Sequence, residues 1–152
     1  MPNEASVTTS GSAVALERFV TAQDPVFDRV CAELRAGRKT SHWMWYVFPQ
    51  LAGLGMSPMS QRYAIADLAE AKAYLAHPIL SARLKHCCEI LLALPQQPLV
   101  EILGAIDEMK FRSSMTLFTQ VPGADPVFQA ALDRFCYGEA DERTLRLLQQ
   151  NG

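Results

Sequence analysis

Hydrophobic side chains recur every three or four residues along most of the chain, which is the spacing of one face of an α-helix. Near the N-terminus, Leu16, Phe19 and Val20 form one such stripe. The broadest apolar face lies between His77 and Pro95, and its members are Leu80, Leu84, Cys87, Cys88, Leu91 and Leu92. The strict alternation of apolar and polar residues that is typical of strands is nearly absent. The pattern therefore predicts an all-α fold.

A second helix is predicted from about Pro25 to Ala36, with Gly37 as its end. Its inward-facing residues are Phe27, Val30, Cys31 and Leu34. Arg29 and Glu33 lie four residues apart, so we expect them to form a pair on the solvent-exposed face of this helix.

Aspartate or serine followed by proline recurs where the apolar stripes begin, and this pair is typical of an N-cap followed by the first helical turn. The pairs are Asp24-Pro25, Ser57-Pro58 and Asp125-Pro126. Single aspartates are predicted to cap further helices at Asp67, Asp107 and Asp141. A short helix over Leu99–Leu103 is expected to end at Gly104. These signals predict a single compact domain of about seven to nine short helices, packed orthogonally, over residues 13–152. Residues 1–12 are expected to form a disordered tail.

The segment Trp43–Phe48 is the least regular part of this pattern, because it is aromatic and apolar on all sides. Intrinsic propensity favours a strand for such a run. A single strand would have no partner to pair with in an otherwise helical chain. We therefore predict a short buried helix here.

Composition narrows the classes of function. The chain has 152 residues, of which 49% are hydrophobic and 20% are charged, as expected for a single globular domain. The net charge of −2 provides no basic excess to bind a phosphate backbone, so nucleic-acid binding is disfavoured. The apolar runs are too short to cross a membrane, and the N-terminus lacks the features of a secretion signal. We therefore expect a soluble, cytoplasmic protein without a membrane partner.

The spacing of the cysteines and histidines does not match that of known metal-binding motifs. The four cysteines include no CxxC motif, and we expect them to be reduced and mostly buried. His77 and His86 are nine residues apart and would point to opposite sides of a shared helix. His77 instead fits the start of the helix that begins at Pro78. We predict no metal site and no cofactor, and the oligomeric state stays open.

A first polar cluster follows the second predicted helix and consists of Arg35, Arg38, Lys39, Ser41 and His42. One interpretation is a solvated helix terminus, with Trp43 and Trp45 packed in the core. The other is an anion site, in which Lys39 and His42 hold a phosphate or carboxylate while the tryptophan rings stack on a base or sugar. Gln50 opens a glycine-containing turn that either approaches the same ligand or serves as an ordinary turn.

A second polar cluster lies between Asp107 and Thr116. On a helix, Ser113 and Ser114 lie on the same face as Lys110. Hydroxyl side chains are unusual in the middle of a helix, because they compete for backbone hydrogen bonds. Three roles stay open: structural hydrogen bonds to carbonyls one turn earlier, hydrogen bonds to a ligand, and a Ser-Lys nucleophilic pair.

Both clusters belong to longer motifs. The motifs are Lys39-x-Ser41-His42-Trp43-Met44-Trp45-x-x-Phe48-Pro49-Gln50, Tyr63-x-Ile65, Ala71-x-Ala73-Tyr74-Leu75-x-His77-Pro78 and Lys110-x-x-Ser113-Ser114-Met115-Thr116-Leu117-Phe118. In them the chain resembles a bacterial family catalogued as domain of unknown function 1810, some members of which carry a calpastatin label. The resemblance implies a mostly helical fold and brings no established activity. Calpastatin-type inhibitors are long, disordered and repetitive, so that label does not fit a compact chain without repeats.

Three hypotheses for function follow. The first is a pocket for a small anionic or nucleotide-like ligand between the segment Lys39–Gln50 and the helix over Lys110–Thr116. The second is a non-catalytic interaction domain or homo-oligomer, in which the tryptophans, Met56 and Met59 form a partner surface. The third is a hydrolase that uses Lys110 with Ser114.

Overall fold

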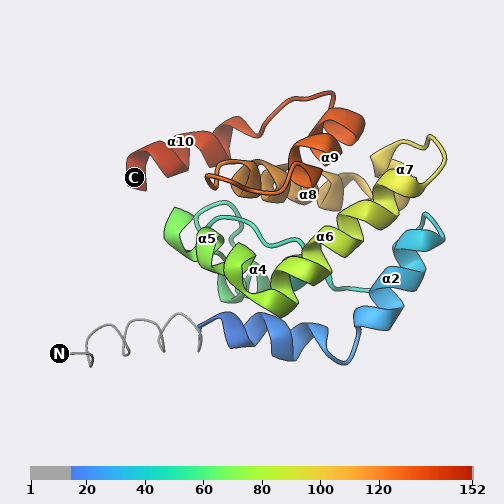
Figure 1. Ribbon diagram of the computed structural model, residues 1–152, viewed down its shortest axis with the longest axis horizontal. Helices are drawn as coiled ribbons and strands as arrows, with labels where there is room; N and C mark the ends of the chain where they lie inside the picture. The colour runs from blue at the N-terminus through green and yellow to red at the C-terminus, as the bar shows by residue number, and fades with distance from the viewer. Residues whose placement is uncertain (1–14, 152) are drawn as a thin grey trace.

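Helices form the architecture of residues 15–151, which are the residues that the computed structural model describes. The first helix covers residues 15–23. It is followed by α2 (Phe27–Arg35), α3 (Met44–Val47), α4 (Pro58–Arg62), α5 (Leu68–Ala76), α6 (Pro78–Ala93), α7 (Leu99–Leu103), α8 (Ala105–Thr119), α9 (Val127–Cys136) and α10 (Glu142–Asn151) (Figure 1). Within this range, β-structure is limited to one isolated parallel β-bridge between Leu51 and Ile65. The all-α prediction is confirmed, and the predicted tail over residues 1–12 lies outside the described residues.

Most of the predicted helix starts are confirmed, because polar side chains accept hydrogen bonds from the first free N–H groups. Ser57 caps α4 through the N–H of Ser60, and Asp67 caps α5 through the N–H of Glu70. The ring of His77 accepts from the first N–H groups of α6, as its place before Pro78 predicted.

Two aspartates do not cap the helices predicted for them. The α8 helix begins at Ala105, directly after Gly104, so Asp107 lies in its first turn. The α2 helix begins at Phe27, and Asp24 instead forms an ion pair with Arg83 at 2.8 Å. In both cases the carboxylate is bound by a cation from a distant part of the sequence.

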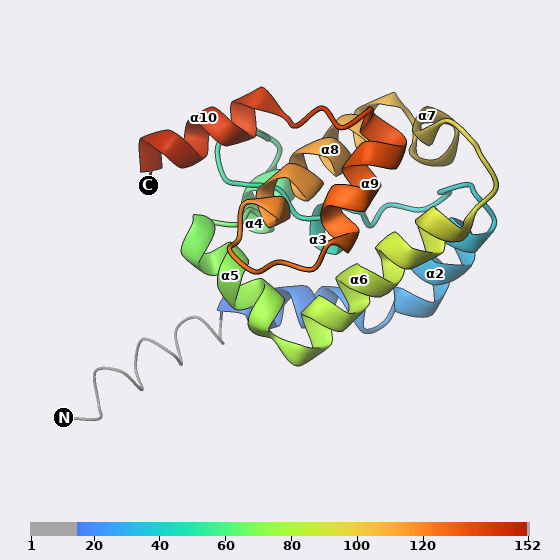
Figure 2. The ribbon, with the colours of Figure 1, turned by 45° about the horizontal axis from the view of Figure 1, so that its top comes forward.

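The α8 helix is the centre of the packing. It contacts α5, α7, α9 and α10, while α6 contacts α2, α5 and α9. Figure 2 shows α9 lying across α8, with α6 running beside α2. The buried residues of α8 cover most of its circumference and are Phe111, Ser113, Ser114, Met115, Thr116, Leu117 and Phe118. No helix among residues 15–151 is long and apolar enough to span a membrane.

The segment Trp43–Phe48 contains the predicted short helix, α3. Trp43, Met44, Val47 and Phe48 are buried, and the ring of Phe48 packs on Phe111 of α8 with 5.1 Å between centroids. This contact joins the first polar cluster of the sequence to the helix that carries the second one. The four cysteines are free and buried, as predicted.

Candidate functional site

The segment that carries the first cluster is fastened at its start to α7. The N–H of Lys39 donates to the carbonyl of Ile102 at 2.7 Å, and the side-chain amide of Gln97 donates to the carbonyl of Gly37 at 3.1 Å. Gly104 adopts a φ of +90° and turns the chain directly from α7 into α8. The first turn of α8 is thereby held beside Lys39.

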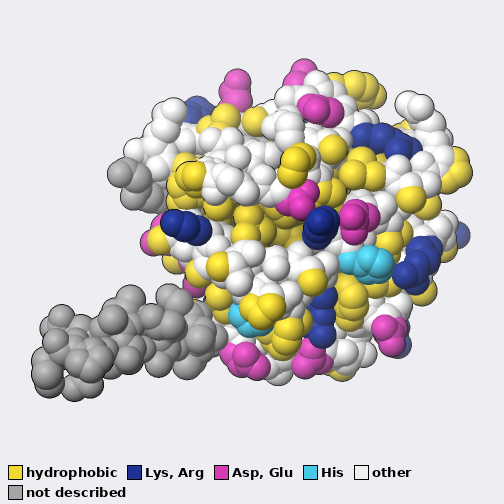
Figure 3. Space-filling view, viewed as in Figure 1, with side chains coloured by type: hydrophobic (Ala, Val, Ile, Leu, Met, Phe, Trp, Pro, Cys, Tyr) yellow, Lys and Arg dark blue, Asp and Glu magenta, His cyan; other side chains and the backbone are white. Residues whose placement is uncertain are grey.

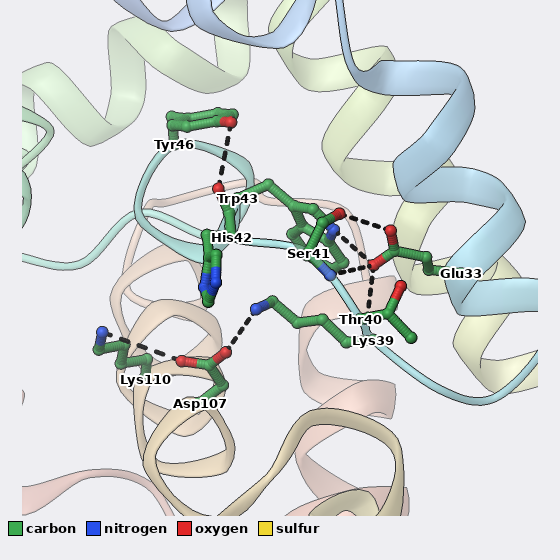
Figure 4. A network of polar contacts seen from close by, with 9 residues as sticks. All are labelled: Glu33, Lys39, Thr40, Ser41, His42, Trp43, Tyr46, Asp107 and Lys110. Carbon is green, nitrogen blue, oxygen red and sulfur yellow. Dashed lines mark hydrogen bonds and ion pairs between the residues drawn. The ribbon is translucent and has the colours of Figure 1, made fainter.

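Glu33 of α2 holds the next residues of this segment. Its carboxylate accepts hydrogen bonds from the N–H of Thr40 at 2.8 Å, the N–H and hydroxyl of Ser41, and the indole N–H of Trp43 at 3.0 Å (Figure 4). Glu33 is 8% exposed, so its predicted place on the solvent-exposed face with Arg29 is wrong. The reason is tertiary: the carboxylate satisfies four donors of a loop that packs against α2.

The hydrogen bonds also keep Glu33 ionised. Burial alone would raise the pKa of its carboxyl group. The hydrogen bonds from Ser41, Thr40 and Trp43 stabilise the charged form more strongly, and the pKa falls from 4.5 to about 2. The segment is thus organised around a carboxylate that stays charged at neutral pH.

Lys39 and Lys110, which lie far apart in the sequence, meet at one carboxylate. The ammonium group of Lys39 lies 2.8 Å from Oδ2 of Asp107, and that of Lys110 lies 3.9 Å from Oδ1 (Figure 4). The side chains of Lys39, Lys110 and Asp107 are 9%, 20% and 17% exposed, respectively. Two positive charges therefore share one negative charge in a partly desolvated place, where electrostatic interactions are stronger than in bulk water.

Both tryptophans lie beside these ammonium groups. The Lys39 ammonium is 5.0 Å from the ring centroid of Trp43, and the Lys110 ammonium is 5.1 Å from that of Trp45, both within the range of a cation–π contact. Trp43 is buried and Trp45 is half-buried. In Figure 4 the ring of His42, an exposed residue, points into the space between the two lysines. We call Lys39, His42, Trp45, Asp107 and Lys110 the lysine-pair site.

The other predicted site residues have structural surroundings. Gln50 contributes its backbone carbonyl, which accepts from the N–H of Ile65 at 2.8 Å. The hydroxyl of Ser113 donates to the carbonyl of Met109 at 3.1 Å, which is the structural bond considered for it. Ser114 is fully buried, and its hydroxyl has no hydrogen-bond partner among residues 15–151. It lies one turn beyond Lys110 on the same face of α8.

The sequence did not predict the role of Asp107 in the lysine-pair site or that of Glu33, which holds the segment that carries Lys39 and His42. Asp107 was predicted to cap a helix at the start of the second polar cluster, although its position three residues before Lys110 already allowed an ion pair on one helix face. Glu33 directly precedes the inward-facing Leu34 of α2, and the polar segment after Gly37 carries N–H groups that need an acceptor. These unpaired N–H groups were the signal in the sequence that a nearby carboxylate would turn inward to accept from them.

The described residues offer neither a cluster of metal ligands nor a Ser-Lys pair with an accessible hydroxyl. No group of three or more His, Cys, Asp or Glu residues in the described range could hold a metal ion. Because the Ser114 hydroxyl is inaccessible to solvent, a substrate cannot reach it without a rearrangement of α8. The lysine-pair site instead combines two ammonium groups with one carboxylate, and each ammonium group lies beside a tryptophan ring.

Comparison with known proteins places the chain in a family. The family model described as "Protein of unknown function (DUF1810)" matches residues 13–148. The crystal structure of the conserved hypothetical protein Rv1873 from Mycobacterium tuberculosis is similar, with a TM-score of 0.86 and 48% sequence identity over 88% of this chain and 96% of that one. No curated protein matches the chain. With most of its residues matched by the family model, this protein belongs to the DUF1810 family, as its motifs indicated.

Proposed function

We propose that this protein binds a small anionic, nucleotide-like ligand at the lysine-pair site, between the segment Lys39–Gln50 and the N-terminal half of α8. The observation that carries the proposal is the meeting of Lys39 and Lys110 at the single carboxylate of Asp107. A phosphate or carboxylate group would join this cluster by accepting hydrogen bonds from both ammonium groups.

The surroundings of the lysines suggest where the rest of the ligand would lie. Trp43 is buried, so its ring supports Lys39 and is not available for stacking. Trp45 is half-buried, and its ring would contact a base or sugar that is attached to the anionic group. The imidazole of His42 would donate a further hydrogen bond from the exposed side.

The two other hypotheses have less support from the described contacts. Met56 is 80% exposed, which suits a partner surface, but Trp43 is buried and unavailable to a partner. A hydrolase that uses Ser114 would need a nucleophile in contact with its substrate, whereas this hydroxyl is fully buried. Light scattering of the purified protein tests the homo-oligomer directly, and a monomer at micromolar concentration would count against it.

Isothermal titration calorimetry with inorganic pyrophosphate, AMP and ADP-ribose measures their binding affinities and so tests the proposal. Lys110→Gln is expected to weaken binding about tenfold, because one charge-assisted hydrogen bond is lost. Asp107→Asn is expected to strengthen binding severalfold, because the internal carboxylate no longer competes for the ammonium groups. Arg29→Gln is the matched control, since it makes the same change of charge at an exposed position on α2. The proposal fails if none of the three probes binds, or if Lys110→Gln and Arg29→Gln weaken binding equally.

A further inference from the structure

A cleft of about 390 Å³ lies away from the lysine-pair site, between α5, α6 and the loop that leads into α9. The face of the molecule that Figure 3 shows is hollowed here, and hydrophobic side chains form the floor of the hollow. Leu75, Val121 and Phe128 contribute apolar lining. Val121 and Phe128 are 5% and 2% exposed, so this part of the lining also belongs to the packed core. The volume of the cleft is within the range of pockets that bind small molecules.

The charged groups of the cleft come from three elements. Lys85 of α6 forms an ion pair with Asp125 at 3.1 Å. Asp125 also accepts a hydrogen bond from the N–H of Val127 at 2.9 Å, which fixes it at the start of α9. The ion pair with Lys85 and the hydrogen bond from Val127 together keep the pKa of Asp125 below its ordinary value, with the backbone hydrogen bond as the larger cause.

Lys72 of α5 is the third charged residue that lines the cleft. Within residues 15–151, no carboxylate lies at ion-pair distance from its ammonium group. The cleft thus has two cations and one anion around an apolar floor. This combination is complementary to a ligand with one negative charge and an apolar body, and it provides little for a highly charged, fully polar ligand.

We infer that this cleft binds a small amphipathic carboxylate, whose apolar chain lies on Leu75, Val121 and Phe128 and whose carboxylate group pairs with Lys72 and Lys85. The inference rests on the cleft and its charges alone, so it is independent of the lysine-pair site. Asp125 would stay bound to the start of α9 and share Lys85 with the ligand, in the way that one ammonium group donates to two acceptors.

Octanoate is the probe, and its binding is followed by two-dimensional NMR of the labelled full-length protein. We expect saturable shifts of backbone amides in α5, α6 and residues 121–126. Octanol, which has the same chain without the charge, and butyrate, which has the charge with a short chain, are each expected to bind at least tenfold more weakly. This comparison separates an amphipathic site from a purely apolar surface and from a simple anion site.

Two substitutions and one control locate the site. Lys72→Gln is expected to weaken octanoate binding about tenfold, and Ala82→Trp, at an exposed position in the lining, is expected to abolish it by filling the cleft. Lys110→Gln is expected to leave octanoate binding unchanged. The inference is overturned if octanoate does not bind, if octanol binds equally well, or if Lys72→Gln and Ala82→Trp both leave the affinity unchanged. Unaltered amide spectra of the unliganded variants show that each one folds.

Discussion

Replacing Glu33 by alanine should be among the most damaging single substitutions in this protein. The change removes the acceptor of four hydrogen bonds and leaves the indole N–H of the buried Trp43 without a partner. Hydrogen bonds to a charged group contribute about 1.5–3 kcal/mol each, and their contributions overlap when they share one acceptor. A buried donor that is left without an acceptor costs about 1–3 kcal/mol, and the indole N–H of Trp43 is the most deeply buried of the four donors. We expect Glu33→Ala to lower the free energy of unfolding by about 3 kcal/mol.

Glu33→Gln separates the hydrogen bonds from the charge. The side-chain carbonyl of glutamine can accept from Thr40, Ser41 and Trp43 in the place of Oε1, so most of the geometry is retained. The charge is lost, and with it the pH dependence. The pKa in the folded protein is about 2 against 4.5 ordinarily, which corresponds to about 3 kcal/mol. Because the folded pKa is the lower one, this stabilisation is complete above about pH 5 and is lost as the pH falls toward 2.

Urea denaturation followed by tryptophan fluorescence and circular dichroism measures both effects. Glu139→Ala, at an exposed loop position, is the control and should change stability by less than about 0.5 kcal/mol. The difference in stability between the wild type and Glu33→Gln should shrink steadily between pH 5 and pH 2. A cost of less than 1 kcal/mol for Glu33→Ala, or a difference between wild type and Glu33→Gln that is the same at pH 7 and pH 2, would refute the reasoning.

Two further predictions concern α8. Ser114→Ala is expected to stabilise the protein by about 1 kcal/mol, because it removes a buried hydroxyl without a partner and introduces a better helix former. Ser113→Ala, which loses a bond to Met109, is the comparison and should gain less in the same urea titration; the opposite order would contradict the assignment. Gly104→Ala is expected to cost about 1–2 kcal/mol in thermal unfolding, since the added Cβ meets no atom within 4 Å and only the φ of +90° is strained. A neutral Gly104→Ala would show that the turn between α7 and α8 relaxes freely.

The helices were predictable because their signals are local. Ser57, Asp67 and Asp141 each accept from an N–H three residues later, a pattern visible in the sequence without any knowledge of the fold. The short helix α3 was predictable by elimination, since no second strand was available to pair with it. Asp107 fits the same capping pattern, but the positive φ of Gly104 begins α8 earlier and frees the carboxylate for the two lysines.

The lysine-pair site was predictable in its parts and not in its assembly. Local composition singled out Lys39 and Lys110, but their meeting depends on the fastening of Lys39 to Ile102, on the turn at Gly104 and on the packing of Phe48 against Phe111. These are contacts between residues distant in sequence, which no periodicity encodes.

The way in which the lysine-pair site is assembled also explains how a chain with a net negative charge has a local excess of positive charge. The carboxylate of Glu33 accepts from four donors in the loop after α2, and the carboxylate that pairs with the two lysines is that of Asp107. One carboxylate cannot neutralise two ammonium groups, and the remaining positive charge is the feature that an anionic ligand would use.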